Sequence, residues 1–153
     1  QSKSGHSYIK EKMREHNAVY GGEMSAHHYF RDFSYCDSGM IPWLLAISVL
    51  SETQQTLSSL VEDMIAKFPC SGEINFKVAN TQVTIQKIFD HFADQNPVID
   101  QTDGVSLDFG IWRLNVRASN TEPLLRLNIE SDASKNPEPI QVYVDQLTQL
   151  IQA

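Results

Sequence analysis

The sequence predicts an α+β fold in which helices cover one face of a mainly antiparallel sheet. Two observations support this fold class. From about residue 56 onward, helical and alternating apolar patterns follow one another in the order α–β–α–β–β–β–α. Three of the strand-like runs are consecutive and are separated by short polar stretches. This succession is typical of antiparallel strands with segregated helices.

The residues before this unit predict a helix, a short strand and a second helix. Ser7 can cap an amphipathic helix over "YIKEKMREHN", because a serine hydroxyl accepts from the free backbone N–H groups of a first turn. "AVY", Ala18–Tyr20, is a strand candidate that ends at a pair of glycines. Asp37 or Ser38 can cap a helix over Met40–Leu50.

The polar run "SETQQ", Ser51–Gln55, predicts a linker. We therefore expect a domain boundary at this run, with residues 1–51 on one side and 52–153 on the other. The chain lacks an initiator methionine and begins in a polar run that already looks helical. This start predicts that the chain is a fragment of a longer protein.

The second unit contains three helical and four strand-like patterns. Pro69 ends the first helix, and Asp103 with Gly104 predicts a turn before the second strand. Helical spacing occurs in "TLSSLVEDMIAKF", "TQVTIQKIFDHFAD" and "PEPIQVYVDQLTQLIQ", and alternation occurs in "GEINFKVAN", "VSLDFG", "IWRLNVRA" and "LLRLNIES".

The composition is that of a soluble globular protein and excludes several function classes. The formal net charge of -7, without a basic stripe, disfavours nucleic acid as a partner. The longest apolar stretch, Met40–Leu50, is too short to span a bilayer, and the N-terminus lacks an apolar signal segment. Cys36 and Cys70 are not spaced as a metal or redox pair. We expect a cytoplasmic protein with reduced cysteines and no membrane partner.

The loop "GGEMSAHH" contains candidate ligand-binding side chains, and three interpretations of it stay open. Glu23, His27 and His28 could bind a metal, but adjacent histidines diverge, so a third ligand would have to come from elsewhere. The loop could instead be solvated, with one histidine packed. As a third possibility, Glu23, Ser25 and an imidazole could clamp vicinal hydroxyls, with glycines allowing close approach.

A second loop, "RASNTEP", lies between two strand-like runs and predicts either a phosphate site or a polar hairpin turn. Arg117 offers a planar fork of donors for phosphate oxygens. Arg113 lies on the same strand face, because strand side chains repeat every two residues. Hydroxyl and amide donors follow in the loop: Ser119, Asn120 and Thr121.

Together, the two loops resemble motifs of the α-D-phosphohexomutases. "GEMSAHHYF" is similar to their sugar-recognition loop, and "RASNTEP" is similar to their phosphate-binding loop. "SGHSYIK" and "YCDSGM" fit the same family in order and spacing, and "YGGEMSAHHYFRDFSYCDSGMIPWLL" is similar to bacterial phosphomannomutases of surface-polysaccharide synthesis. The resemblance covers essentially the whole chain.

The resemblance implies a partial α/β segment, the end of domain 3, followed by a complete domain 4 with a TATA-box-binding-protein-like fold. It also implies roles for individual residues. Glu23 and Ser25 would contact sugar hydroxyls, His27 would line the site, and His6 would lie near the reacting end. Four residues would bind the phosphate that is not transferred: Arg117, Ser119, Asn120 and Thr121. His28 lies outside the motif positions and receives no role.

The resemblance further implies a parent enzyme that interconverts mannose 6-phosphate and mannose 1-phosphate through a hexose 1,6-bisphosphate. The family's "TASHNP"-like serine loop and "DGDGDR"-like Mg²⁺ loop do not occur in this sequence. We therefore expect no metal in this chain, no activity of the chain alone, and docking with N-terminal domains of the parent. The alternatives are a phosphoglucomutase, an enzyme with dual specificity, and a non-catalytic module that binds phosphosugars.

Overall fold

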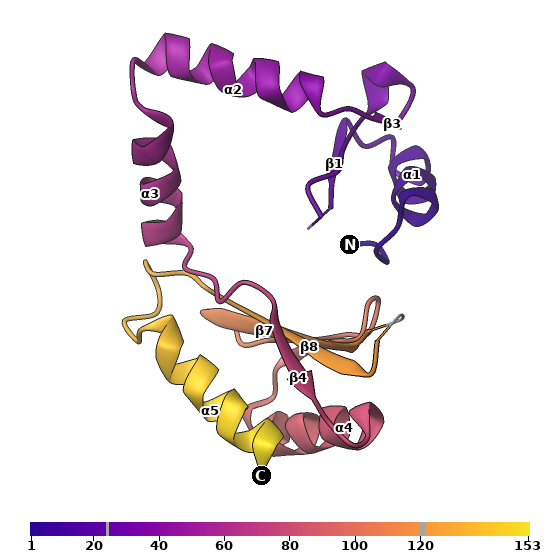
Figure 1. Ribbon diagram of the computed structural model, residues 1–153, viewed down its shortest axis with the longest axis vertical. Helices are drawn as coiled ribbons and strands as arrows, with labels where there is room; N and C mark the ends of the chain where they lie inside the picture. The colour runs from indigo at the N-terminus through magenta and orange to yellow at the C-terminus, as the bar shows by residue number, and fades with distance from the viewer. Residues whose placement is uncertain (24, 120–121) are drawn as a thin grey trace. The chain divides into compact units, whose positions relative to one another are not determined.

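The computed structural model describes residues 1–23, 25–119 and 122–153 and divides into two compact units, Gln1–Leu60 and Val61–Ala153 (Figure 1). Each unit has its own cluster of buried side chains and is described by itself. Among the described residues, no helix is long and apolar enough to cross a bilayer. The domain boundary predicted at Ser51 and Glu52 stays a prediction.

The N-terminal unit is built on a small antiparallel sheet in the order β1-β2-β3. Tyr29 of the middle strand is fully buried and packs with two side chains of the first helix, Ile9 and Met13. The elements of this unit are α1 (His6–Glu15), β1 (Tyr20–Gly22), β2 (His28–Phe30), the 3-10 helix η1 (Arg31–Phe33), β3 (Cys36–Asp37) and α2 (Met40–Thr53).

Strand β1 lies two residues later than the sequence predicts, because it includes the glycines that were expected to end it. A Cβ atom on Gly21 would lie 2.7 Å from the Sδ atom of Met13 and 3.2 Å from Cγ2 of Ile9. Glycine at this position therefore lets the strand backbone pack directly on helix α1. The strand expected over Ala18–Tyr20 is corrected to Tyr20–Gly22.

The helix ends differ in part from the predictions. Ser7 lies inside α1, and Gly5 is the cap residue with a φ of 124°, so the predicted serine cap is wrong. Ser38 does accept at the start of α2, where its hydroxyl lies 3.2 Å from the backbone N of Ile41. Helix α2 continues to Thr53, so the predicted linker is wrong for its first three residues. There the Thr53 hydroxyl donates to the carbonyl of Val49 at 2.7 Å within the same helix.

The C-terminal unit contains a five-stranded antiparallel sheet in the order β4-β8-β7-β6-β5. Strand β5 was not predicted; it has only three residues, and Val98 and Ile99 are exposed at the sheet edge. Helix α3 (Leu57–Lys67) begins in the N-terminal unit and continues into this one. The other elements are β4 (Ile74–Lys77), α4 (Thr81–Phe92), the 3-10 helix η2 (Ala93–Gln95), β5 (Val98–Asp100), β6 (Val105–Asp108), β7 (Trp112–Ala118), β8 (Leu124–Ser131) and α5 (Ile140–Gln152).

Helices α4 and α5 lie on the same side of this sheet (Figure 1). Strand β7 alternates buried and partly exposed residues, so Leu114 and Val116 face the helices while Arg113 and Arg117 share the opposite face. The helices contribute buried side chains to the same cluster, among them Ile88, Phe92, Leu147 and Ile151. The predicted α+β class with helices on one sheet face is confirmed, and the open face carries polar side chains.

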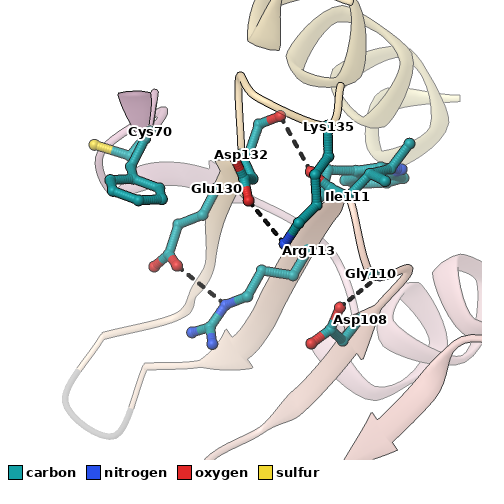
Figure 2. A pocket seen from close by; sticks show the side chains of 11 residues that line it. Cys70, Asp108, Gly110, Ile111, Arg113, Glu130, Asp132 and Lys135 are labelled. Atoms are coloured by element: carbon teal, nitrogen blue, oxygen red, sulfur yellow. Dashed lines mark hydrogen bonds and ion pairs between the residues drawn. The ribbon is translucent and has the colours of Figure 1, made fainter. Parts of the chain in front are cut away.

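A turn after β8 provides a test of one local interaction. Asp132 accepts from the Ser134 hydroxyl at 2.6 Å and from Lys135 at 2.9 Å, the second of which appears in Figure 2. These hydrogen bonds lower the pKa of Asp132 from 3.8 to about 2. Because the folded-state pKa lies below the unfolded value, the ionised carboxylate stabilises the fold above about pH 4. This contribution is lost as the pH falls towards about 2.

We expect Asp132→Asn to lower the thermal unfolding midpoint near neutral pH and to lower it less as the pH falls from about 4 to about 2. Unfolding curves at a series of pH values, followed by circular dichroism, measure this difference. Asp63→Asn, which changes an exposed carboxylate of α3, is the matched control. A difference between Asp132→Asn and the native chain that is independent of pH would contradict the assignment.

Candidate functional site

The loop between β1 and β2 holds the first group of candidate residues. The strand register pairs Gly22 with His28, so residues 23–27 connect the two strands. The backbone N of Glu23 donates to the carbonyl of His27 at 3.0 Å, and Ala26 adopts a left-handed φ of 63° in the turn. The hairpin therefore brings Glu23 and His27 side by side at its base. Ser25 lies in the turn and is exposed.

The Glu23 carboxylate is fixed by two donors from different parts of the unit. Its Oε1 accepts from the backbone N of Gly5 at 3.0 Å, and its Oε2 accepts from the Tyr29 hydroxyl at 3.1 Å. Tyr29 is fully buried, and this burial, with the hydrogen bond to Glu23, raises the pKa of Tyr29 to about 12. The hydroxyl therefore stays protonated and remains a donor to Glu23 across the physiological pH range.

The His27 ring is oriented by Asp37 of strand β3. His27 Nδ1 lies 2.8 Å from Oδ2 of Asp37, and the other oxygen of Asp37 accepts from the backbone N of His28 at 3.0 Å. The hydrogen bond to His27, followed by that from His28, lowers the pKa of Asp37 below its usual range. An ionised Asp37 keeps a proton on Nδ1 of His27, which leaves Nε2 of the ring available to a ligand.

His6, the first residue of α1, joins this pair from a distant part of the sequence. Its ring lies edge-on to His27 at 4.6 Å between centroids and perpendicular to Tyr29 at 5.4 Å. One ligand atom each from His6, Glu23 and His27 lies within 4.8 Å of the other two. His28 is not part of this group, and its Nδ1 lies 2.7 Å from the Tyr20 hydroxyl.

The second candidate group lies at the β7–β8 connection of the C-terminal unit. Arg117 is near the end of β7, and its partly buried guanidinium lies 3.5 Å from a carboxylate oxygen of Glu73. The backbone N of Ser119 donates to Leu124 at 2.8 Å, and the Ser119 hydroxyl accepts from the backbone N of Glu122 at 3.3 Å. Two predicted phosphate-binding residues, Asn120 and Thr121, lie outside the described residues.

Glu73 and Arg126 extend this group beyond the residues selected from the sequence. The strand register places Arg126 directly opposite Arg117, and both guanidinium groups lie 3.5 Å from the same Oε2 atom of Glu73. The buried Nε of Arg126 has no hydrogen-bond partner among the described residues. Glu73 thus faces two cations on adjacent strands, and a carboxylate oxygen of Glu122 lies 4.0 Å from a terminal nitrogen of Arg126. The hairpin register could have revealed Arg126, whereas Glu73 follows only from the pairing of β4 with β8.

A separate pocket of about 340 Å³ lies on the same unit, between the segment after α3 and the far ends of β7 and β8 (Figure 2). Arg113 contributes to it and forms an ion pair with Glu130 at 3.1 Å. Asp108 accepts from the backbone N of Gly110 at 2.7 Å. Arg113 does share a strand face with Arg117, as predicted, but its charge is already paired.

Comparison with known families assigns the class of this protein. Residues 1–68 match the family model described as phosphoglucomutase/phosphomannomutase, alpha/beta/alpha domain III. Residues 73–145 match the model described as phosphoglucomutase/phosphomannomutase, C-terminal domain. The chain therefore belongs to the phosphoglucomutase/phosphomannomutase family, and its two matched regions correspond to the third and C-terminal domains.

Individual relatives agree with this assignment. The chain is 62% identical over 129 residues to a Xanthomonas campestris protein named "Phosphohexose mutases", covering 84% of this chain and 29% of the relative. It is 52% identical over 151 residues to a Vibrio cholerae phosphomannomutase, covering 98% and 32%. A crystal structure of a Burkholderia thailandensis phosphoglucomutase/phosphomannomutase family protein matches the fold with a TM-score of 0.65 at 24% identity, covering 99% of this chain and 32% of that one. The chain thus spans about a third of the length of these proteins.

Proposed function

We propose that this chain is the substrate-binding C-terminal part of a phosphomannomutase that interconverts mannose 6-phosphate and mannose 1-phosphate. The observation that carries the proposal is the fixed arrangement of Glu23 and His27, in a chain whose curated relatives include phosphomannomutases at 50–56% identity. A site that must distinguish one hexose from another needs polar groups held in place before the sugar arrives.

Glu23 and His27 are suited to clamp sugar hydroxyls. An ionised carboxylate has about four lone-pair sites, and the protein donors to Glu23 use two of them. The remaining sites can accept from vicinal hydroxyls. Nε2 of His27 can accept from a further hydroxyl, while the exposed hydroxyl of Ser25 can donate or accept. We assign His6 to the lining of the same site, beside His27.

Arg117 and its loop are suited to hold the phosphate that is not transferred. The guanidinium forks of Arg117 and Arg126 lie on adjacent strands and face the same oxygen of Glu73, while the buried Nε of Arg126 has no hydrogen-bond partner among the described residues. A phosphate group would accept hydrogen bonds from these guanidinium donors. The proposal includes Ser119 and the two following residues, Asn120 and Thr121, as hydroxyl and amide donors to the same phosphate.

We further propose that the parent turns over a hexose 1,6-bisphosphate and binds Mg²⁺ through residues outside this chain. Mg²⁺ prefers oxygen ligands, whereas the His6, Glu23 and His27 group offers two imidazoles and one carboxylate. We propose that the chain alone is inactive and that the parent is cytoplasmic. Exposed apolar side chains of α2, among them Trp43, Leu44 and Leu45, support docking with other domains of the parent.

A broader hexose specificity is the second candidate. It is favoured by the name "Phosphohexose mutases" of the relative that is 62% identical. Mannose and glucose differ at the 2-hydroxyl, so a phosphoglucomutase or an enzyme with dual specificity could use the same clamp. A non-catalytic phosphosugar-binding module would need only the two groups described above.

Phosphate titration of the isotope-labelled chain, followed by NMR, tests the phosphate site. We expect inorganic phosphate to shift the backbone signals of Arg117 and Ser119, and Arg117→Lys to weaken binding, because lysine keeps the charge but loses the planar fork. Glu23→Gln is the control, since it lies in the other unit and should leave phosphate binding unchanged. Shifts at Glu23 and His27, without shifts at Arg117, would show that the two loops were assigned the wrong way round.

A further inference from the structure

We propose that His6, Glu23 and His27 form a binding site for a zinc-class divalent cation, in which the three side chains supply one ligand atom each. These atoms already lie within 4.8 Å of one another. The sequence alone argued against a metal here, because the adjacent histidines of the loop diverge. The structure instead brings the third ligand from helix α1.

The donor set selects the class of metal. Two imidazole nitrogens and one carboxylate oxygen are ligands that Zn²⁺ binds at about 2.0–2.2 Å. Mg²⁺ and Ca²⁺ prefer sites made of oxygen ligands alone, so this group disfavours both ions. Three protein ligands leave the fourth tetrahedral position of a zinc ion open to water.

The residues around the three ligands also fit a metal site. Metal-binding histidines commonly donate their second ring N–H to a carboxylate, which fixes the tautomer and orients the ring. Asp37 has this position at Nδ1 of His27, at 2.8 Å. The Glu23 carboxylate is oriented in turn by the backbone N of Gly5 and the buried hydroxyl of Tyr29. Two of the three ligands are therefore already held in place.

Closing the site requires only side-chain movement. Tetrahedral zinc with bonds of about 2.0–2.1 Å separates its ligand atoms by about 3.4 Å. The present separations, of up to 4.8 Å, must therefore shorten by about 1.4 Å at most. His6 can supply its share of this shift, because it is exposed at the first position of α1 and packs edge-on against the rings of His27 and Tyr29.

Zinc at this position would affect the proposed binding of sugar hydroxyls by Glu23 and His27. This part of the inference rests on the proposed function. Glu23 and His27 cannot direct the same lone pairs to a metal and to sugar hydroxyls. Zinc and the sugar would therefore compete, and zinc would act as an inhibitor that blocks sugar recognition without involving the phosphate site at Arg117.

The test measures binding of Zn²⁺ alone by titration calorimetry, and of Co²⁺ by its visible absorption. The whole chain is used in a Cys36→Ser, Cys70→Ser background, because both free thiols are exposed and could bind the metal themselves. We expect one metal per chain, with binding weakened at least about tenfold by His6→Ala, Glu23→Gln or His27→Ala. Asp37→Asn should weaken it about 10- to 100-fold.

Two histidines outside the group provide matched controls. His28→Ala removes the ring next in sequence to His27, and His16→Ala removes an exposed ring beyond the end of α1. Neither change should alter the affinity for metal. His6→Ala changes an exposed side chain and leaves the buried cluster intact, so a loss of binding in this variant does not depend on misfolding. The absence of binding to the native group, or equal losses in variants and controls, would overturn the inference.

A competition measurement separates this inference from the proposed function. Mannose 1-phosphate should weaken the apparent affinity for Zn²⁺ more than the same concentration of inorganic phosphate does. If zinc binding requires the three ligands but the sugar phosphate has no greater effect than phosphate, the metal site stands. The sugar-clamp role of Glu23 and His27 is then the part that fails.

Discussion

Replacement of Leu127 by alanine is expected to lower the free energy of unfolding of the C-terminal unit by about 2.7–5 kcal/mol. Leu127 is fully buried in β8, where the register pairs it with Ile74 on one side and Val116 on the other. Removing its side chain loses buried apolar contact and leaves a cavity, because a paired strand with neighbours on both sides cannot collapse into the space. This loss is a large part of the stability of an ordinary domain.

Urea unfolding followed by Trp112 fluorescence measures the change. Trp112 reports on the core because its ring stacks on Phe109 at 4.4 Å and on Tyr143 at 4.2 Å. A Trp43→Phe background removes the other tryptophan signal. Val83→Ala is the control, since Val83 is 64% exposed on α4, and its loss should change stability by no more than about 0.5 kcal/mol. Equal losses in the two variants would contradict the assigned core.

The substitution Gly104→Ala is expected to destabilise the C-terminal unit by about 2–4 kcal/mol and to disturb the phosphate site as well. Gly104 has a φ of 74°, which L-residues adopt at a cost. A Cβ atom there would lie 2.4 Å from the carbonyl oxygen of Val116 and 2.5 Å from Cβ of Arg117. The β7 backbone must therefore move at the residue proposed to bind phosphate.

The variant Gly110→Ala separates the cost of the positive φ from the cost of the steric contact with β7. Gly110 has a φ of 82°, and a Cβ atom there would have no neighbour within 4 Å. We expect this control to lose about 1–2 kcal/mol of stability from the backbone conformation alone, because its added Cβ atom contacts no neighbour. Phosphate titration should show altered signals of Arg117 in Gly104→Ala but native signals in Gly110→Ala. Similar losses of stability and native Arg117 signals in both variants would disprove the close approach at Gly104.

Most of the fold could be predicted because its elements carry strong local periodicity. The helices over residues 57–67, 81–92 and 140–152 and the strands of the central sheet follow from apolar spacing. The failures have local physical causes. Strand β5 is short and exposed at an edge, which leaves no alternation to detect. Strand β1 depends on contact between Gly21 and Met13, and this contact is tertiary.

The sequence could predict the loops of the candidate site but not the residues that hold their side chains in place. Glu23, His27 and Arg117 stand in recognisable motifs, whereas the groups that hold them are distant in sequence. Glu23 receives one of its two donors from Gly5, 18 positions away, and Arg117 meets Glu73, 44 positions away. Such contacts arise from strand pairing and helix packing, which periodicity does not specify.

The order of strands in the C-terminal sheet has a consequence for how the unit folds. The neighbours β5, β6, β7 and β8 are consecutive in sequence, so their pairing closes only short loops. Strand β4 pairs with β8 across a much longer stretch, with Lys77 opposite Leu124, and so we expect it to join last. Glu73 arrives with β4. Until then, Arg117 and Arg126 repel each other on adjacent strands, so an anion in solution would stabilise the pairing of β7 with β8 before β4 joins.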